Sequence, residues 1–195
     1  MKRRFVLGMI AAMGVCSPLL AADYKDAVPY SKKRVTHVQT HPADQNTRVY
    51  NSANLLIEDS VATALTFDAE RWDTDELHQA SVTPSRLTAQ TDGQYLIFGH
   101  VVFASDPDGY RQMDIRLNGT TSLARVIQDG TAIPGNALTI TTYYNLAAND
   151  YVELVVYQTA GASLAVLADQ NISPEFGMVK QPSLPSDPTA PSPTE

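Results

Sequence analysis

The densest group of chemically capable side chains in this 195-residue sequence lies in residues 70–78. Four carboxylates and a histidine fall within these nine positions. Carboxylate oxygens are the ligands that calcium prefers, so Asp73, Asp75 and Glu76 are candidate calcium ligands on one loop. The segment lacks the glycine and the spacing of a twelve-residue calcium loop. The alternative is turn and capping chemistry, in which the same carboxylates fix the loop beneath Trp72.

Patterns typical of catalysis are weak in the sequence. Glu70 and Asp73 have the residue types of a glycosidase pair, but no sequence feature sets the distance between them. No serine lies in a nucleophile-elbow motif, and neither a phosphate-binding glycine loop nor a His/Cys metal spacing occurs. We therefore expect a protein that is not an enzyme and that requires no cofactor, with calcium as the one ligand to test.

The net negative charge argues against nucleic acid as a partner. The formal net charge is −7, and residues 51–180 alone carry 16 acidic and six basic side chains. A surface that binds nucleic-acid phosphates needs an excess of lysine and arginine. We expect no nucleic-acid partner.

The N-terminus has the layout of an export signal. Residues 1–22 contain Lys2-Arg3-Arg4, then an apolar run, then Ala21-Ala22, which is the order of a secretory signal peptide. The alternative is an apolar N-terminal arm that packs on a neighbouring subunit of an assembly. After residue 22 no stretch approaches the roughly 20 apolar residues of a membrane helix, so we expect no transmembrane span in the mature chain.

Two further segments are poor in hydrophobic periodicity. Residues 23–50 mix basic residues, histidines and prolines, and are predicted to be a linker or extended arm. Residues 181–195 are rich in proline and serine, cannot bury a core, and are predicted to be disordered. The folded domain is expected between them, over residues 51–180.

Short alternating segments with turn signals fill that domain. Residues 138–158 give the clearest example, with apolar residues at every second position on both sides of the polar turn at 147–150, and we expect a long β-hairpin. Asn118-Gly119 is the strongest short hairpin signal. Roughly nine or ten strands at this spacing predict an all-β sandwich.

One predicted strand, residues 95–104, is apolar on both faces. One face belongs to the core of a two-layer sandwich, and the other needs a second cover. A neighbouring subunit would supply this cover, although a long loop of the same chain is an alternative. The opposite set on this strand is Leu96, Phe98, Val102 and Ala104. The residues expected at a subunit interface are Tyr95, Ile97, Val101, Phe103 and Tyr143.

A series of short motifs runs in order through residues 51–180. It comprises Ala64-Leu65-Thr66-Phe67-Asp68, Arg71-Trp72-Asp73-Thr74-Asp75, Ser85-Arg86-Leu87-Thr88-Ala89, Gly93-x-Tyr95, Gly109-Tyr110-Arg111, Leu117-Asn118-Gly119-Thr120-Thr121, Ala148-Asn149-Asp150-Tyr151-Val152 and Phe176-Gly177-Met178. The ordered set resembles the C1q/TNF-like jelly-roll family, in its bacterial and phage version. Asn149 departs from the family, which usually has glycine there, but asparagine also tolerates a left-handed turn.

The resemblance implies a ten-stranded jelly-roll sandwich that forms a homotrimer. Members of the family are mostly recognition or structural heads on secreted proteins, while phage relatives cap or decorate virion parts. The resemblance brings no shared catalytic apparatus. Some members hold calcium between subunits.

We therefore expect a non-enzymatic, trimeric protein, secreted or displayed at the cell surface, that binds an unidentified surface ligand through loops and subunit interfaces. The alternative is a structural component of a phage or virion, such as a fibre tip or decoration protein, with residues 1–50 docking into the assembly. Removal of residues 1–22 from the mature protein would support the first function. Their retention and burial against another chain would support the second.

Overall fold

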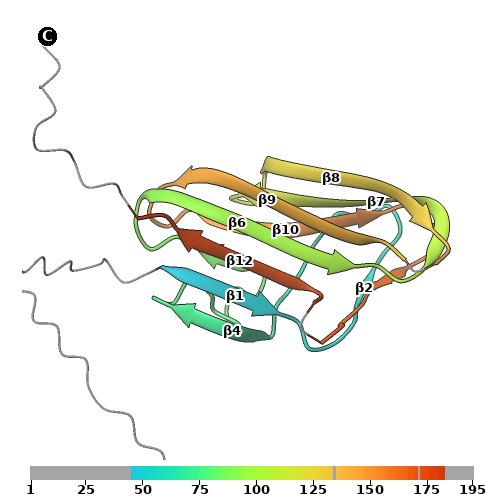
Figure 1. The fold of residues 1–195 in the computed structure, drawn as a ribbon, viewed down its shortest axis with the longest axis horizontal. Helices are drawn as coiled ribbons and strands as arrows, with labels where there is room; N and C mark the ends of the chain where they lie inside the picture. Colours follow the sequence, from blue (N-terminus) through green and yellow to red (C-terminus); the bar gives the residue numbers. More distant parts are fainter. Residues whose placement is uncertain (1–44, 134, 171, 183–195) are drawn as a thin grey trace, which may run out of the picture. The chain divides into compact units, whose positions relative to one another are not determined.

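The computed structural model describes residues 45–133, 135–170 and 172–182 of the chain. Figure 1 shows how the strands of this part are arranged. The predictions for the signal peptide at residues 1–22, for residues 23–44 and for residues 183–195 lie outside the described residues. No helix in the described ranges is long and apolar enough to cross a membrane.

The described chain is all-β and consists mainly of two five-stranded antiparallel sheets. The first sheet has the order β4-β1-β12-β6-β9, with bounds Ala69–Thr74, Asn46–Tyr50, Glu175–Lys180, Gly93–Val102 and Ala137–Leu146. The second has the order β3-β10-β7-β8, and β5 also pairs with β10; their bounds are Thr63–Ala64, Tyr151–Gln158, Asp106–Leu117, Thr121–Thr131 and Arg86–Thr88. A two-stranded ribbon joins β2 (Leu55–Ile57) to β11 (Leu164–Val166). The predicted ten-stranded sandwich is confirmed.

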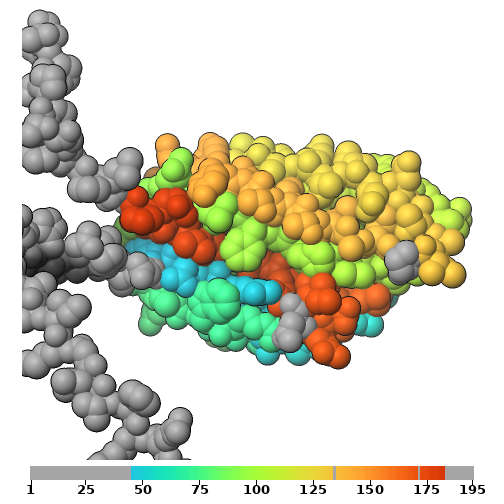
Figure 2. All heavy atoms as spheres, viewed as in Figure 1, coloured from blue at the N-terminus to red at the C-terminus, as the bar shows by residue number. Residues whose placement is uncertain are grey.

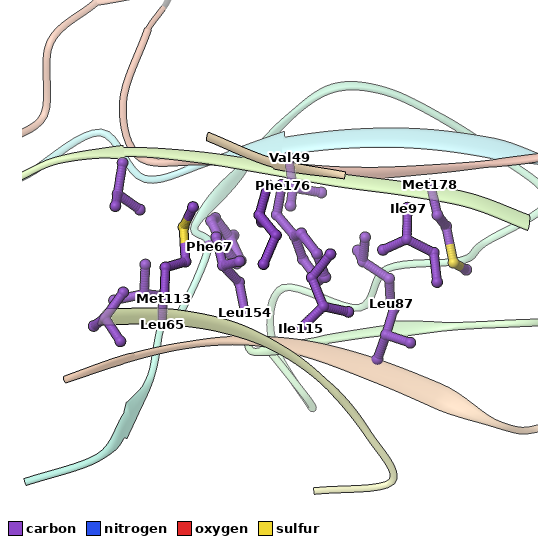
Figure 3. Close-up of a cluster of buried hydrophobic side chains, with 14 of the residues drawn as sticks. Val49, Leu65, Phe67, Leu87, Ile97, Met113, Ile115, Leu154, Phe176 and Met178 are labelled. Atoms are coloured by element: carbon purple, nitrogen blue, oxygen red, sulfur yellow. The ribbon is translucent and has the colours of Figure 1, made fainter. Parts of the chain in front are cut away.

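The core lies between the two sheets. Figure 3 shows its side chains filling the space between the ribbons, with Phe176 and Ile97 from the first sheet and Leu154 and Ile115 from the second. The rings of Phe67 and Phe176 are stacked with their centroids 5.8 Å apart. The burial of these apolar side chains is the main free-energy term that holds the sheets together.

The predicted interface on β6 is wrong in its choice of face. Four of its predicted members, Tyr95, Ile97, Val101 and Phe103, have no exposed surface and belong to the core. Because successive side chains of a strand point to opposite faces, the outward residues of β6 are the other set, which includes Leu96, Phe98 and His100. Both sets are largely apolar, so alternation alone does not identify the inward one.

The predicted domain boundary also needs correction. Asn46–Tyr50, placed in a linker by the sequence, form β1 between β4 and β12. Val49 and Thr47 are fully buried. The polar residues of this strand hide its alternation, because only Val49 is an apolar residue on its inward face.

The predicted hairpin at residues 138–158 is two strands of different sheets. β9 pairs with β6, whereas β10 pairs with β7, β5 and β3. Residues 147–150 therefore form a corner between the layers. Asn149 adopts a φ of +71°, which confirms the left-handed turn expected there. β9 buries Leu138, Ile140 and Leu146 as predicted, although Tyr144 is 39% exposed. β10 is buried on both faces from Val152 to Val156, because its polar face with Glu153 is covered as well.

Candidate functional site

The outer face of the first sheet carries apolar and aromatic side chains interspersed with threonines and a few charged groups. The pairing register places them in rows that cross the strands. One row contains Tyr143, Leu96 and Val179; the next contains Thr141, Phe98, Gly177, Arg48 and Trp72; the third contains Thr139, His100, Glu175 and Tyr50. Figure 2 looks onto this face, where atoms of β9, β6, β12, β1 and β4 reach the surface.

In the middle of this face, a glycine on β12 makes room for the Phe98 ring. Gly177 lies opposite Phe98, and a Cβ atom on Gly177 would lie 2.8 Å from Cε2 of the Phe98 ring. The same Cβ would lie 2.8 Å from the carbonyl oxygen of Thr47. Glycine therefore lets the Phe98 ring lie over β12, where it presents an aromatic surface beside the neighbouring rows.

A buried carboxylate connects three strands beside Phe98. Glu175 is 3% exposed and is paired with Arg48 of β1 and with Arg71 of β4, whose Nη2 lies 3.1 Å from Glu175 Oε1. The Arg71 guanidinium also lies 3.9 Å from the centroid of the Tyr50 ring. A buried carboxylate with two cationic partners is satisfied, so covering this cluster would not leave its charge unpaired.

The exposed aromatic side chains are at the two edges of the face. Trp72 on β4 is 44% exposed and has the Arg48 guanidinium 5.8 Å from its ring centroid. Tyr143 on β9 is 55% exposed. Ile172, just before β12, is 51% exposed. Exposed tryptophan and tyrosine, with an arginine beside the tryptophan, form a composition typical of protein interfaces.

Around Phe98 and His100 lies a hollow of about 540 Å³. Its lining is mostly apolar or uncharged, with one histidine and one arginine–glutamate pair. The lining residues are Arg48, Leu96, Phe98, Gly99, His100, Thr139, Thr141, Ile172 and Glu175.

His100 is the one titratable ring that lines this hollow. Its Nδ1 lies 2.7 Å from Oγ1 of Thr139, while its Nε2 is buried and has no hydrogen-bond partner among the described residues. Burial lowers the pKa of His100 below its ordinary value of 6.5, and the negative charge of Glu175 opposes this shift in part. The neutral imidazole is thus the form that this position favours.

In the acidic segment at residues 70–78, carboxylates accept hydrogen bonds from backbone N–H groups and from a side-chain amide. The carboxylate of Asp73 accepts hydrogen bonds from the backbone N–H groups of Leu77, at 3.1 Å, and His78, at 3.0 Å. The carboxylate of Asp75 accepts one from the Gln45 amide at 2.6 Å. Glu76 has a positive φ of 54° in the turn.

This geometry favours turn and capping chemistry over the calcium site. No three His, Cys, Asp or Glu side chains within the described ranges are grouped so that they can hold a metal ion. Asp73, Asp75 and Glu76 are therefore not brought together as a ligand set. Glu70, the other half of the glycosidase pair, lies 2.9 Å from His78 Nδ1. Calcium binding itself stays a prediction.

Sequence reasoning placed Tyr143 on this face and missed most of its companions. Arg48 lay in the supposed linker and Arg71 in the supposed loop, and their meeting at Glu175 depends on the pairing of β4, β1 and β12. The available signal was the second apolar set on β6, which begins with Leu96 and Phe98.

No family model and no curated protein sequence matches this chain. Among solved structures, Eiger TNF from S. frugiperda is 14% identical, with a TM-score of 0.51 over 77% of this chain and 99% of that one. Murine APRIL at pH 5.0 is 16% identical, with a TM-score of 0.53 over 71% and 99%. The globular domain of the zebrafish complement 1qA protein has a TM-score of 0.48. At these identities the likeness is one of fold, and with the strand order above it leads to one conclusion: the chain has the C1q/TNF-like jelly-roll fold.

Proposed function

We propose that this chain is a non-enzymatic recognition or structural head that associates with itself, as a homotrimer, through the outer face of the first sheet. The observation that carries the proposal is the exposed apolar and aromatic surface around Phe98, with Trp72 and Tyr143 at its edges. The trimeric state is the one that the resemblance to the C1q/TNF-like family implies.

Physical chemistry supports self-association at this face. Apolar surface removed from water contributes roughly 25 cal/mol per Å², and aromatic residues with arginine provide most of the affinity of protein interfaces. Leu96 and Phe98 are only half-buried in the single chain. The charged groups beside them are already paired through Glu175, so a covering subunit would desolvate few unpaired charges.

Loops outside the sheets are the proposed contacts with an external partner. Val82 is 70% exposed in the loop after β4, and Ile133 is 86% exposed in the loop after β8. Aliphatic side chains at loop tips are suited to anchoring a protein or other surface ligand. The identity of this ligand would come from binding experiments with the assembled protein.

The place of action is proposed from the N-terminal sequence. Lys2-Arg3-Arg4 and the following apolar run support export, which gives a secreted or surface-displayed head. Mass spectrometry of the mature protein tests this location. A mature chain that starts after residue 22 would support export, whereas a chain that keeps residues 1–22 inside a particle would support the virion alternative.

The association surface can be tested with one matched pair of variants. Phe98→Asp places a charge in the middle of the proposed interface, so we expect the oligomer to dissociate to monomers in light scattering of the full chain. Ile127→Asp is the control, because Ile127 is 55% exposed but lies on β8 of the other sheet. Circular dichroism of both variants checks that the fold is kept.

If Phe98→Asp stays folded and keeps the mass of the unmodified chain, the outer face of the first sheet is not the interface. If both variants dissociate, the contact depends on β8 as well, and the proposed surface is wrong.

A further inference from the structure

We propose that protonation of His100 weakens association through the outer face of the first sheet, so that the assembly is stable at neutral pH and dissociates on acidification. This inference rests on the proposed self-association, and it adds a form of regulation that neither the fold nor the composition of the surface requires.

The position of His100 within the surface is the first argument. It lies on β6 in the same row as Glu175 and Thr139, and it lines the hollow between Phe98 and Ile172. A second chain that covers Phe98 would therefore cover the imidazole as well. Any change of charge on His100 would occur inside the contact.

The hydrogen bonding of the ring disfavours its protonated form. One ring nitrogen, Nδ1, is within 2.7 Å of the Thr139 hydroxyl. The other, Nε2, is buried without a partner among the described residues. A protonated ring carries an N–H on both nitrogens, and a buried N–H of a cation without an acceptor is costly.

The charges that face His100 do not outweigh the effect of its burial. On β12 the facing group is Glu175, whose carboxylate is already paired with Arg48 of β1 and Arg71 of β4. On β9 the facing groups are the hydroxyls of Thr139 and Thr141, which carry no charge. The Glu175 carboxylate, shared by two arginines, favours a protonated His100, and the effect of burial outweighs it.

The direction of the pH effect follows from these contacts. In the single chain, burial already lowers the pKa of His100 below 6.5, despite the opposing charge of Glu175. A covering chain removes more water from the ring, which lowers this pKa further. Association then requires the neutral ring, so it is strongest above the pKa of the free chain and declines as the pH falls through that pKa.

The experiment is sedimentation velocity of the full chain between about pH 8 and about pH 5, the interval in which histidines titrate. Below the pKa of the free chain, the association constant is expected to fall by up to about tenfold per pH unit for each His100 that must lose a proton. The variants His100→Asn and His100→Gln carry amides that do not titrate here, so at least one that folds should associate with little dependence on pH.

His78→Asn is the matched control, because His78 is also buried but pairs with Glu70 and does not line the hollow. It should keep the pH dependence of the unmodified chain. An assembly that is unchanged or tighter near pH 5 would overturn the inference and leave self-association standing. Equal acid dissociation in the His100 variants would overturn it as well. A chain that is monomeric at every pH would overturn both the inference and the proposed function.

Discussion

Asp73 shows why an acidic cluster is a poor guide to a metal site. Its two carboxylate oxygens accept the N–H groups of Leu77 and His78, just after β4 ends. These bonds hold a turn in which Asp75 and Glu76 adopt positive φ values of 82° and 54°. Residues other than glycine pay a conformational cost in that region, and the Asp73 carboxylate offsets it.

At the residue scale, we predict that Asp73→Ala lowers the free energy of unfolding by about 1–3 kcal/mol, because two backbone N–H groups lose a charged acceptor. Thermal and urea unfolding measure the change. Glu76→Gln, which leaves both bonds in place, should change stability little.

Calcium should leave the thermal midpoint of the unmodified chain where it is, since a ligand that does not bind the folded state does not stabilise it. A midpoint that rises with calcium, and does so less in Asp73→Ala and Glu76→Gln, would instead support the ligand set that the sequence suggested.

At the scale of elements, the sequence predicts the strands whose inward residues are apolar and fails for those whose residues are polar. β6, β7 and β9 follow visible alternation. β1 and β4 are rich in polar and charged residues, because their outward side chains build the Glu175 cluster. That cluster joins strands far apart in the sequence, so only the register of the folded sheet brings it together.

The sequence alone also does not show which face of β6 points into the core, because both faces are apolar. Tyr95 belongs to the core, and its hydroxyl oxygen lies 2.5 Å from Gln45 Oε1 and 2.8 Å from the Thr91 carbonyl oxygen, either of which can accept its one proton. Phe98 is equally apolar but faces outward over Gly177. Two apolar sets on one strand predict that both faces of the strand are covered. Gly177 on the partner strand β12 distinguishes the outward face, because it makes room for the Phe98 ring.

The position of β1 makes a prediction about truncation. β1 pairs with both β4 and β12, and Val49 fills the core. Removal of residues 1–44 should therefore preserve a cooperative unfolding transition, whereas removal of residues 1–50 should abolish it or lower the midpoint strongly. Thermal unfolding by circular dichroism compares the two truncated chains. Equal stability of both would mean that β1 is dispensable, contrary to its central place in the sheet.

At the scale of the whole molecule, the outer faces of the two sheets differ in chemistry. On the second sheet, Asp114 of β7 is fully buried beneath Arg125 of β8, whose Nε and Nη2 bond its two oxygens at 2.7 and 2.8 Å. Ile127 of β8 is also exposed on that sheet. The first sheet has its own charged cluster at Glu175, and beside it presents the rings of Phe98 and Trp72 and the hollow. The aromatic rings and the hollow make the first sheet the better candidate for contact with a protein partner.

The measurement that tests this account most directly is the mass of the full, unmodified chain by sedimentation equilibrium at micromolar concentration and neutral pH. We predict a species of three times the chain mass, because the outer face of the first sheet is the proposed self-association surface and the C1q/TNF-like resemblance implies three chains. A chain that sediments as a monomer throughout this concentration range would contradict the central claim.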